Sequence, residues 1–120
     1  MLYKGMSACS NDPVWQSPYA QLLAKLRKIE PVNYGKLSLL NVASGYDWIY
    51  ILKYAATGAG SLNGEKMTAW VEQNAPSMKL IYSPLRASKT DHFMIGPDAL
   101  TPGNDVANAR ADGMMKRAGC

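Results

Sequence analysis

The sequence predicts a chain of the α/β class, or of the α+β class if it stands alone, with three helices followed by short antiparallel strands. Apolar residues recur at helical spacing in three segments between residues 17 and 73. From about residue 76, proline and glycine divide the chain into short β-like runs, and an Asp-Gly turn signal stands at 112–113. We therefore expect a single domain over residues 1–120, with a helical part at about 11–75 and a strand and loop tail at about 76–120.

The first helix is expected over residues 17–29, after an amino-terminal stretch with little periodicity at 1–16. Ser17 fits the N-cap position and Pro18 fits the first helical position. One apolar stripe then follows at helical spacing, formed by Tyr19, Leu22, Leu23, Leu26 and Ile29. Basic residues gather at the carboxyl end, where the helix dipole favours cations, and Pro31 ends the helix.

The second helix is expected over residues 39–56, and it is apolar almost all round. Gly45 is a weak point, so the helix could instead begin near Ser44. Residues 57–60 read Thr-Gly-Ala-Gly and are typical of a helix end rather than of a phosphate-binding loop. A helix with apolar residues on every side has to be covered on more than one side. We therefore expect that part of the surrounding structure is missing or that the chain pairs with itself.

The third helix is expected over residues 64–73, with Asn63 as its cap. Beyond it, residues 78–83 and 93–95 have the composition of short strands. The segment 106–117 reads as a β-hairpin that turns at Ala-Asp-Gly.

The net charge of +4 permits an anionic partner but does not favour one, because the basic residues are dispersed along the chain. We expect a solvated surface and no nucleic acid partner. No apolar run has the roughly 18 residues that a membrane span needs. Residues 1–6 contain no apolar core, so no export signal is expected in this chain.

Few side chains have a spacing that predicts chemistry. Cys9 and Cys120 could pair only if the two ends meet, and we expect structural or incidental roles for them. His92 follows Asp91, but neighbouring side chains diverge in an extended chain, and His92 is expected to donate to the backbone. Ser88 and Thr90 lie nearby without a strand–turn–helix elbow. We therefore expect no enzyme activity, no metal site and no cofactor.

Five segments occur in an order that resembles a known family. The chain reads Asn-Asp-Pro-Val-Trp at 11–15, Ser-Gly-Tyr-Asp at 44–47 and Thr-Gly-Ala-Gly-Ser-Leu-Asn-Gly-Glu-Lys at 57–66. It then reads Ser-Pro-Leu-Arg-Ala-Ser-Lys-Thr-Asp-His at 83–92 and Asp-Gly-Met-Met-Lys-Arg at 112–117. This order resembles the carboxyl-terminal part of the substrate-binding proteins of ABC transporters, of the branched-chain amino acid or extracellular ligand-binding receptor type.

The resemblance implies part of a periplasmic-binding-protein type I lobe. Complete members are much longer, with two α/β lobes around a cleft, and they recognise the solute mainly with residues upstream of the part that this chain resembles. The resemblance implies binding of a small solute, delivery to an ABC permease and a periplasmic location for the complete protein only. Tyr46 and Asp47 match the Gly-Tyr-Asp motif, so they are the candidate ligand-binding residues, although the motif could serve only to position the helix.

A second interpretation needs no transport role. The apolar segment around Trp48, Ile49 and Leu52 could be covered by a second copy of the chain, which makes a homo-oligomer the expected state. Under this alternative the chain is a self-associating structural or interaction protein. The aromatic residues of the segment (Tyr46, Trp48, Tyr50 and Tyr54) could line a pocket, but core packing is the favoured interpretation.

Overall fold

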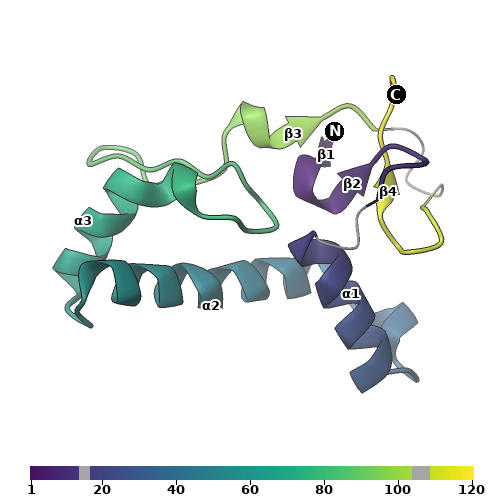
Figure 1. Ribbon diagram of the computed structural model, residues 1–120, viewed down its shortest axis with the longest axis horizontal. Helices are drawn as coiled ribbons and strands as arrows, with labels where there is room; N and C mark the ends of the chain where they lie inside the picture. Colours follow the sequence, from purple (N-terminus) through teal and green to yellow (C-terminus); the bar gives the residue numbers. More distant parts are fainter. Residues whose placement is uncertain (14–16, 104–108) are drawn as a thin grey trace.

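The computed structural model describes residues 1–13, 17–103 and 109–120 as a mixed helical and β structure (Figure 1). Its helices are α1 (Pro18–Ile29), α2 (Leu39–Ala59) and α3 (Gly64–Asn74). Its strands are β1 (Leu2–Tyr3), β2 (Ser7–Ala8), β3 (Leu100–Thr101) and β4 (Met115–Lys116). Short 3-10 turns occur at Lys4–Met6, Tyr34–Lys36, Ala75–Ser77 and Pro97–Ala99. The predicted mixture of three helices and small sheets is confirmed for the described residues.

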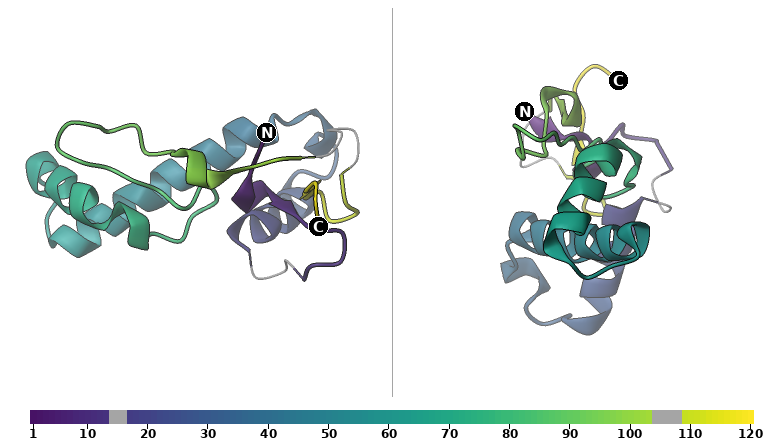
Figure 2. Two further views of the ribbon diagram at one scale, coloured as in Figure 1. Left: turned by 90° about the horizontal axis from the view of Figure 1, so that it is seen from above. Right: turned by 90° about the vertical axis from the view of Figure 1, so that its left-hand side faces the viewer.

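The other elements are arranged along the long helix α2 (Figures 1 and 2). At one end α3 folds back onto it, and at the other end α1 and the four short strands gather near the two chain termini. The molecule measures 42 × 33 × 22 Å along its principal axes. In the described part of the chain, none of the helices combines the length and the apolar character that crossing a membrane requires.

The helix caps lie where the sequence predicts them. Ser17 accepts a hydrogen bond from the Ala20 amide at 3.0 Å, and Asn63 accepts one from the Lys66 amide at 3.1 Å. Each bond satisfies one amide that the first helical turn leaves unpaired. Gly60 ends α2 with a φ of 60°, a left-handed conformation that glycine adopts without steric cost.

Helix α2 differs from the prediction at its carboxyl end, where it continues to Ala59 instead of stopping at residue 56. It begins at Leu39, so the alternative start near Ser44 is wrong. Gly58 therefore lies inside the helix. A Cβ atom placed on it would lie 2.0 Å from the indole of Trp70, so this glycine permits close packing of α2 against α3.

The prediction of antiparallel strands within the tail holds only for isolated bridges, among them Leu85 with Ile95 and Ala109 with Met115, and not for the strands themselves. β3 pairs antiparallel with β1, but β4 pairs in parallel with β2, so both tail strands use partners from the amino terminus. The predicted turn at 111–113 is present, because the Gly113 amide donates to the Arg110 carbonyl at 2.9 Å. The first arm of the predicted hairpin, at 106–108, lies outside the described residues. Residues 93–95 contribute one isolated bridge, between Leu85 and Ile95.

The predicted strand at 78–83 is wrong, since this segment forms turns. Three of its amides bond to side chains rather than to a neighbouring strand: Leu80 donates to the Ser83 hydroxyl at 2.8 Å, and the next two amides donate to Asp47. Met78 and Ile81 are nonetheless fully buried, together with Leu23 and Met114. The apolar composition of this segment thus marks burial and not a strand.

The termini are joined. Cys9 and Cys120 form a disulfide with Cα atoms 5.7 Å apart. Beside it, the Arg110 guanidinium donates to the Cys9 carbonyl and, at 2.7 Å, to the Asp12 carbonyl. These contacts hold the amino-terminal segment against the tail, so both cysteines have a structural role.

Candidate functional site

The two residues of the Gly-Tyr-Asp motif point to different surroundings. Asp47 is 3 % exposed, and its carboxylate accepts two consecutive backbone amides, from Ile81 at 3.0 Å and from Tyr82 at 2.8 Å. Burial raises the pKa of the Asp47 carboxyl above 3.8, and the two amide hydrogen bonds oppose that shift. Both carboxylate oxygens are thus engaged by the backbone, and Asp47 fastens the 78–83 turn to α2.

Tyr46 packs against Tyr50, one turn further along α2, with ring centroids 4.5 Å apart. Burial, followed by the hydrogen bond with Tyr50, raises the pKa of Tyr46 to about 12. Tyr46 and Asp47 are therefore not brought together around one ligand position. The fold supports the interpretation that the motif positions the helix.

Tyr82 completes this attachment of the turn to the helix. Its hydroxyl donates to the Leu40 carbonyl at 3.0 Å and lies 3.2 Å from the Ser44 hydroxyl. Its ring meets Tyr3 edge-on, with centroids 4.6 Å apart. The segment 81–82 is thereby fixed to both the amino-terminal half of α2 and the first strand.

One groove combines an apolar lining with polar groups at its edge. It encloses about 230 Å³ between α2, α3 and the loop that follows residue 86. Side chains from all three elements line it, among them Trp48, Ile51, Leu52, Met67, Val71 and Met94. A smaller hollow of about 90 Å³ shares Trp48, Ile51 and Met94 with it and reaches to Asp47.

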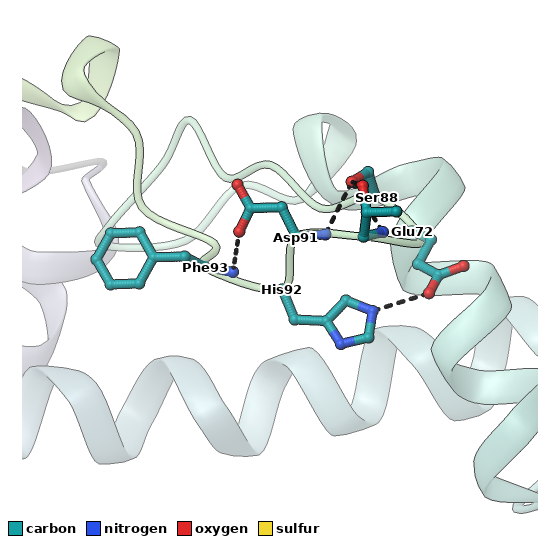
Figure 3. Close-up of polar contacts among 6 residues, drawn as sticks. Glu72, Ser88, Asp91, His92 and Phe93 are labelled. Atoms are coloured by element: carbon teal, nitrogen blue, oxygen red, sulfur yellow. Dashed lines mark hydrogen bonds and ion pairs between the residues drawn. The ribbon is translucent and has the colours of Figure 1, made fainter.

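The polar edge of the groove is formed by α3 and the loop (Figure 3). His92 points toward Glu72, and its Nε2 lies 2.8 Å from Glu72 Oε1. The Glu72 side chain is only 15 % exposed, whereas that of His92 is 61 % exposed. The expectation that His92 donates to the backbone is wrong, because the fold of the loop brings it to a carboxylate 20 residues away in the chain.

The neighbours of His92 do not form a catalytic set with it. Asp91 accepts the Phe93 amide at 2.8 Å, and Ser88 accepts the Asp91 amide at 3.1 Å (Figure 3). The Ser88 hydroxyl and the Asp91 carboxylate thus stabilise the loop itself, and Thr90 lies 3.4 Å from Ser88. Among the described residues, no group of three or more His, Cys, Asp or Glu side chains could hold a metal ion.

Sequence reasoning did not single out Glu72 or the groove. Met67 and Val71 are recognisable from the helical spacing as the apolar face of α3, and Glu72 directly follows Val71. The signal that could have found the site is a carboxylate at the border of an apolar helix face, but its partner His92 comes from a distant loop. Asp47, by contrast, was singled out, and the fold assigns it a structural contact.

No family model, no characterised protein and no solved structure matches this chain in sequence or in fold.

The apolar face of α2 remains open. Trp48, Ile49 and Leu52 lie within two turns of one another and are 60 %, 68 % and 57 % exposed. Gly45 extends this face by one turn, and a Cβ atom placed there would meet no atom within 4 Å. Large apolar side chains gathered on one helix face are typical of a surface that contacts another protein. We call Trp48, Ile49 and Leu52 the open face of α2.

Proposed function

We propose that this chain is part of a solute-binding protein that serves an ABC transporter for branched-chain amino acids or related small carboxylates. The observation that carries the proposal is the open face of α2, which follows directly on the Gly-Tyr-Asp segment. In a complete protein this face is covered by the rest of a periplasmic-binding-protein type I lobe. The order of the five family-like segments supports the same assignment.

In this role the chain performs no chemical step. The complete protein closes two lobes on its solute by a hinge and delivers the solute to the permease. Asp47 contributes by fastening the 78–83 turn to α2, so it orients a wall of the lobe and does not touch the solute. The disulfide between Cys9 and Cys120 fits the oxidising periplasm, where such bonds persist.

Reconstitution tests the proposal. Genes for a permease and an ATPase should lie beside this one, and the adjacent solute-binding-protein segment, co-expressed with this chain, should form a complex that binds leucine or valine in calorimetry. The chain alone should give no saturable heat with either amino acid. Ile49→Gln should prevent the complex, because it places an amide in the covered face, whereas Lys66→Gln on exposed α3 surface should not. Saturable leucine binding by the chain alone would contradict the proposal, as would the failure of any complex to form.

The open face also favours a second candidate, a self-associating structural or interaction protein. Two copies could cover Trp48, Ile49 and Leu52 mutually, and the absence of a side chain at Gly45 would let the helices approach closely. Sedimentation velocity separates the two candidates. Self-association predicts a concentration-dependent dimer that Ile49→Gln abolishes, and a monomer at high concentration would contradict it.

A further inference from the structure

We infer that the groove between α2 and α3 is a binding site for a small primary amine with an apolar body, recognised by Glu72. The groove shares Trp48 and Leu52 with the open face of α2, but the inference does not rest on the proposed transport role, and its tests use the chain alone. The inference stands on the shape of the groove, the placement of one carboxylate and the lack of a lysine or arginine among the described residues that line it.

The groove suits a small ligand. Its volume of about 230 Å³ far exceeds the ~10–15 Å³ that a cavity needs to hold one water, so it has room for a small molecule. Its lining is mainly apolar, and Trp48, Leu52 and Met94 enclose it from two sides. Most binding sites for small molecules combine such a lining with a few polar groups that orient the ligand.

The group that we expect to recognise the ligand is the Glu72 carboxylate, which lines the groove. Oε1 is held by His92 at 2.8 Å, and among the described residues Oε2 has no hydrogen-bond or ion-pair partner. The side chain is only 15 % exposed, but Oε2 itself is accessible from solvent, so a ligand atom can reach it. An ammonium group at Oε2 would supply the missing charge-assisted hydrogen bond.

The same geometry disfavours anions and amino acids. No lysine or arginine is among the described residues that line the groove, so a ligand carboxylate has no cation to pair with except His92. His92 is already bonded to Glu72, and a ligand carboxylate would have to break that contact. The site should therefore bind an amine more tightly than the amino acid from which the amine derives.

A matched set of ligands tests this charge preference: isopentylamine, leucine and isocaproate share the branched apolar body and differ in the charged groups. The methyl groups of the methionines, followed by NMR, locate the binding. Isopentylamine should shift Met67 and Met94 saturably and leave the buried Met6 and Met114 unchanged. Leucine and isocaproate, whose carboxylates find no lysine or arginine among the described lining residues, should give no saturable shift. The inference fails if isocaproate or leucine binds as well as the amine, or if the amine shifts no groove methionine.

Variants test the role of Glu72. Glu72→Gln should weaken isopentylamine binding about 10- to 100-fold, the effect of losing a hydrogen bond to a charged group. Glu65→Gln, on the exposed first turn of the same helix, should leave binding unchanged. Unchanged methyl shifts of the buried Met6 and Met114 show that Glu72→Gln is folded, and the ligand comparison on the parent chain decides the question if it is not. Undiminished binding by a folded Glu72→Gln would overturn the assignment.

This test and that of the transport role fail independently. If the amine does not bind, the groove assignment falls and the reconstitution experiment is unaffected. If no complex forms on the open face of α2 and the amine still binds, the transport role falls and the groove assignment remains.

Discussion

Replacing Asp47 by asparagine should destabilise the protein although it changes neither the size nor the shape of the side chain. The carboxylate accepts the amides of Ile81 and Tyr82 with one oxygen each, at 3.0 and 2.8 Å. Asparagine has one oxygen and one NH2 group, so it can accept only one amide and turns a donor toward the other. The Asp47→Asn variant therefore leaves one buried N–H group unsatisfied.

A buried donor without a partner costs about 1–3 kcal/mol. The asparagine NH2 group would also face a backbone N–H, and the repulsion between these two donors adds to that cost. Because asparagine is neutral, the variant no longer has to bury a charge, and this offsets part of the loss. We expect Asp47→Asn to lower the free energy of unfolding by about 2 kcal/mol. Urea unfolding followed by tryptophan fluorescence measures the change, and Asp98→Asn, at an exposed position, should stay within about 0.5 kcal/mol of the parent protein. A parent-like stability of Asp47→Asn would refute the hydrogen-bond role of the carboxylate.

The raised pKa of Asp47 also predicts how the stability difference between the parent protein and Asp47→Asn depends on pH. Between 3.8, the unfolded value, and the higher folded value, the folded protein binds more protons than the unfolded chain. The contribution of Asp47 to stability is therefore full below 3.8 and declines as the pH rises through that window. The stability difference between the parent and Asp47→Asn should shrink as the pH rises there, and a difference that grows would contradict the direction of the shift.

The remaining predictions concern the joined ends, the helix contact and the buried tyrosine. Replacing Cys9 and Cys120 by serine opens a cross-link across a sequence separation of 111, and loop-closure entropy predicts a loss of about 4–5 kcal/mol in urea unfolding; a loss under 1 kcal/mol would contradict it. Gly58→Ala should destabilise by about 1–3 kcal/mol because the added methyl meets the indole of α3, while Gly45→Ala, in open space, should stabilise by about 0.5–1 kcal/mol. Equal effects of the two glycine changes would refute the close contact. Burial raises the pKa of Tyr19 to about 12. An ultraviolet titration of a Tyr19→Phe variant should therefore lack one phenolate ionisation near pH 12 that the parent protein shows. The stability that Tyr19 contributes should decline as the pH rises from 10 toward 12.

The helices could be predicted because their signals are local. Ser17 and Asn63 cap the helices that follow them, and Gly60 ends α2, each through hydrogen bonds or dihedral angles set within a few residues. The apolar spacing of the second helix also indicated correctly that one chain leaves part of α2 exposed, and Ile49 is 68 % exposed. These features depend on neighbours in the sequence.

The candidate site could be predicted only in part. Asp47 was singled out by a motif, but its role depends on two amides that lie 34 and 35 residues further along the chain. Nothing local links Glu72 to His92, since the two come together only where the loop after residue 86 folds over α3. Chemistry that depends on two distant segments is invisible to spacing within one segment.

The sequence by itself determined that there are three helices and where their caps at Ser17, Asn63 and Gly60 lie, because capping and periodicity act over one or two turns of chain. Only the tertiary structure decided that the tail strands pair with the amino terminus, that residues 78–83 fold as turns around Asp47 and that Glu72 meets His92. The physical reason is that strand pairing and buried hydrogen bonds take whichever partner the packing of the whole chain brings within reach.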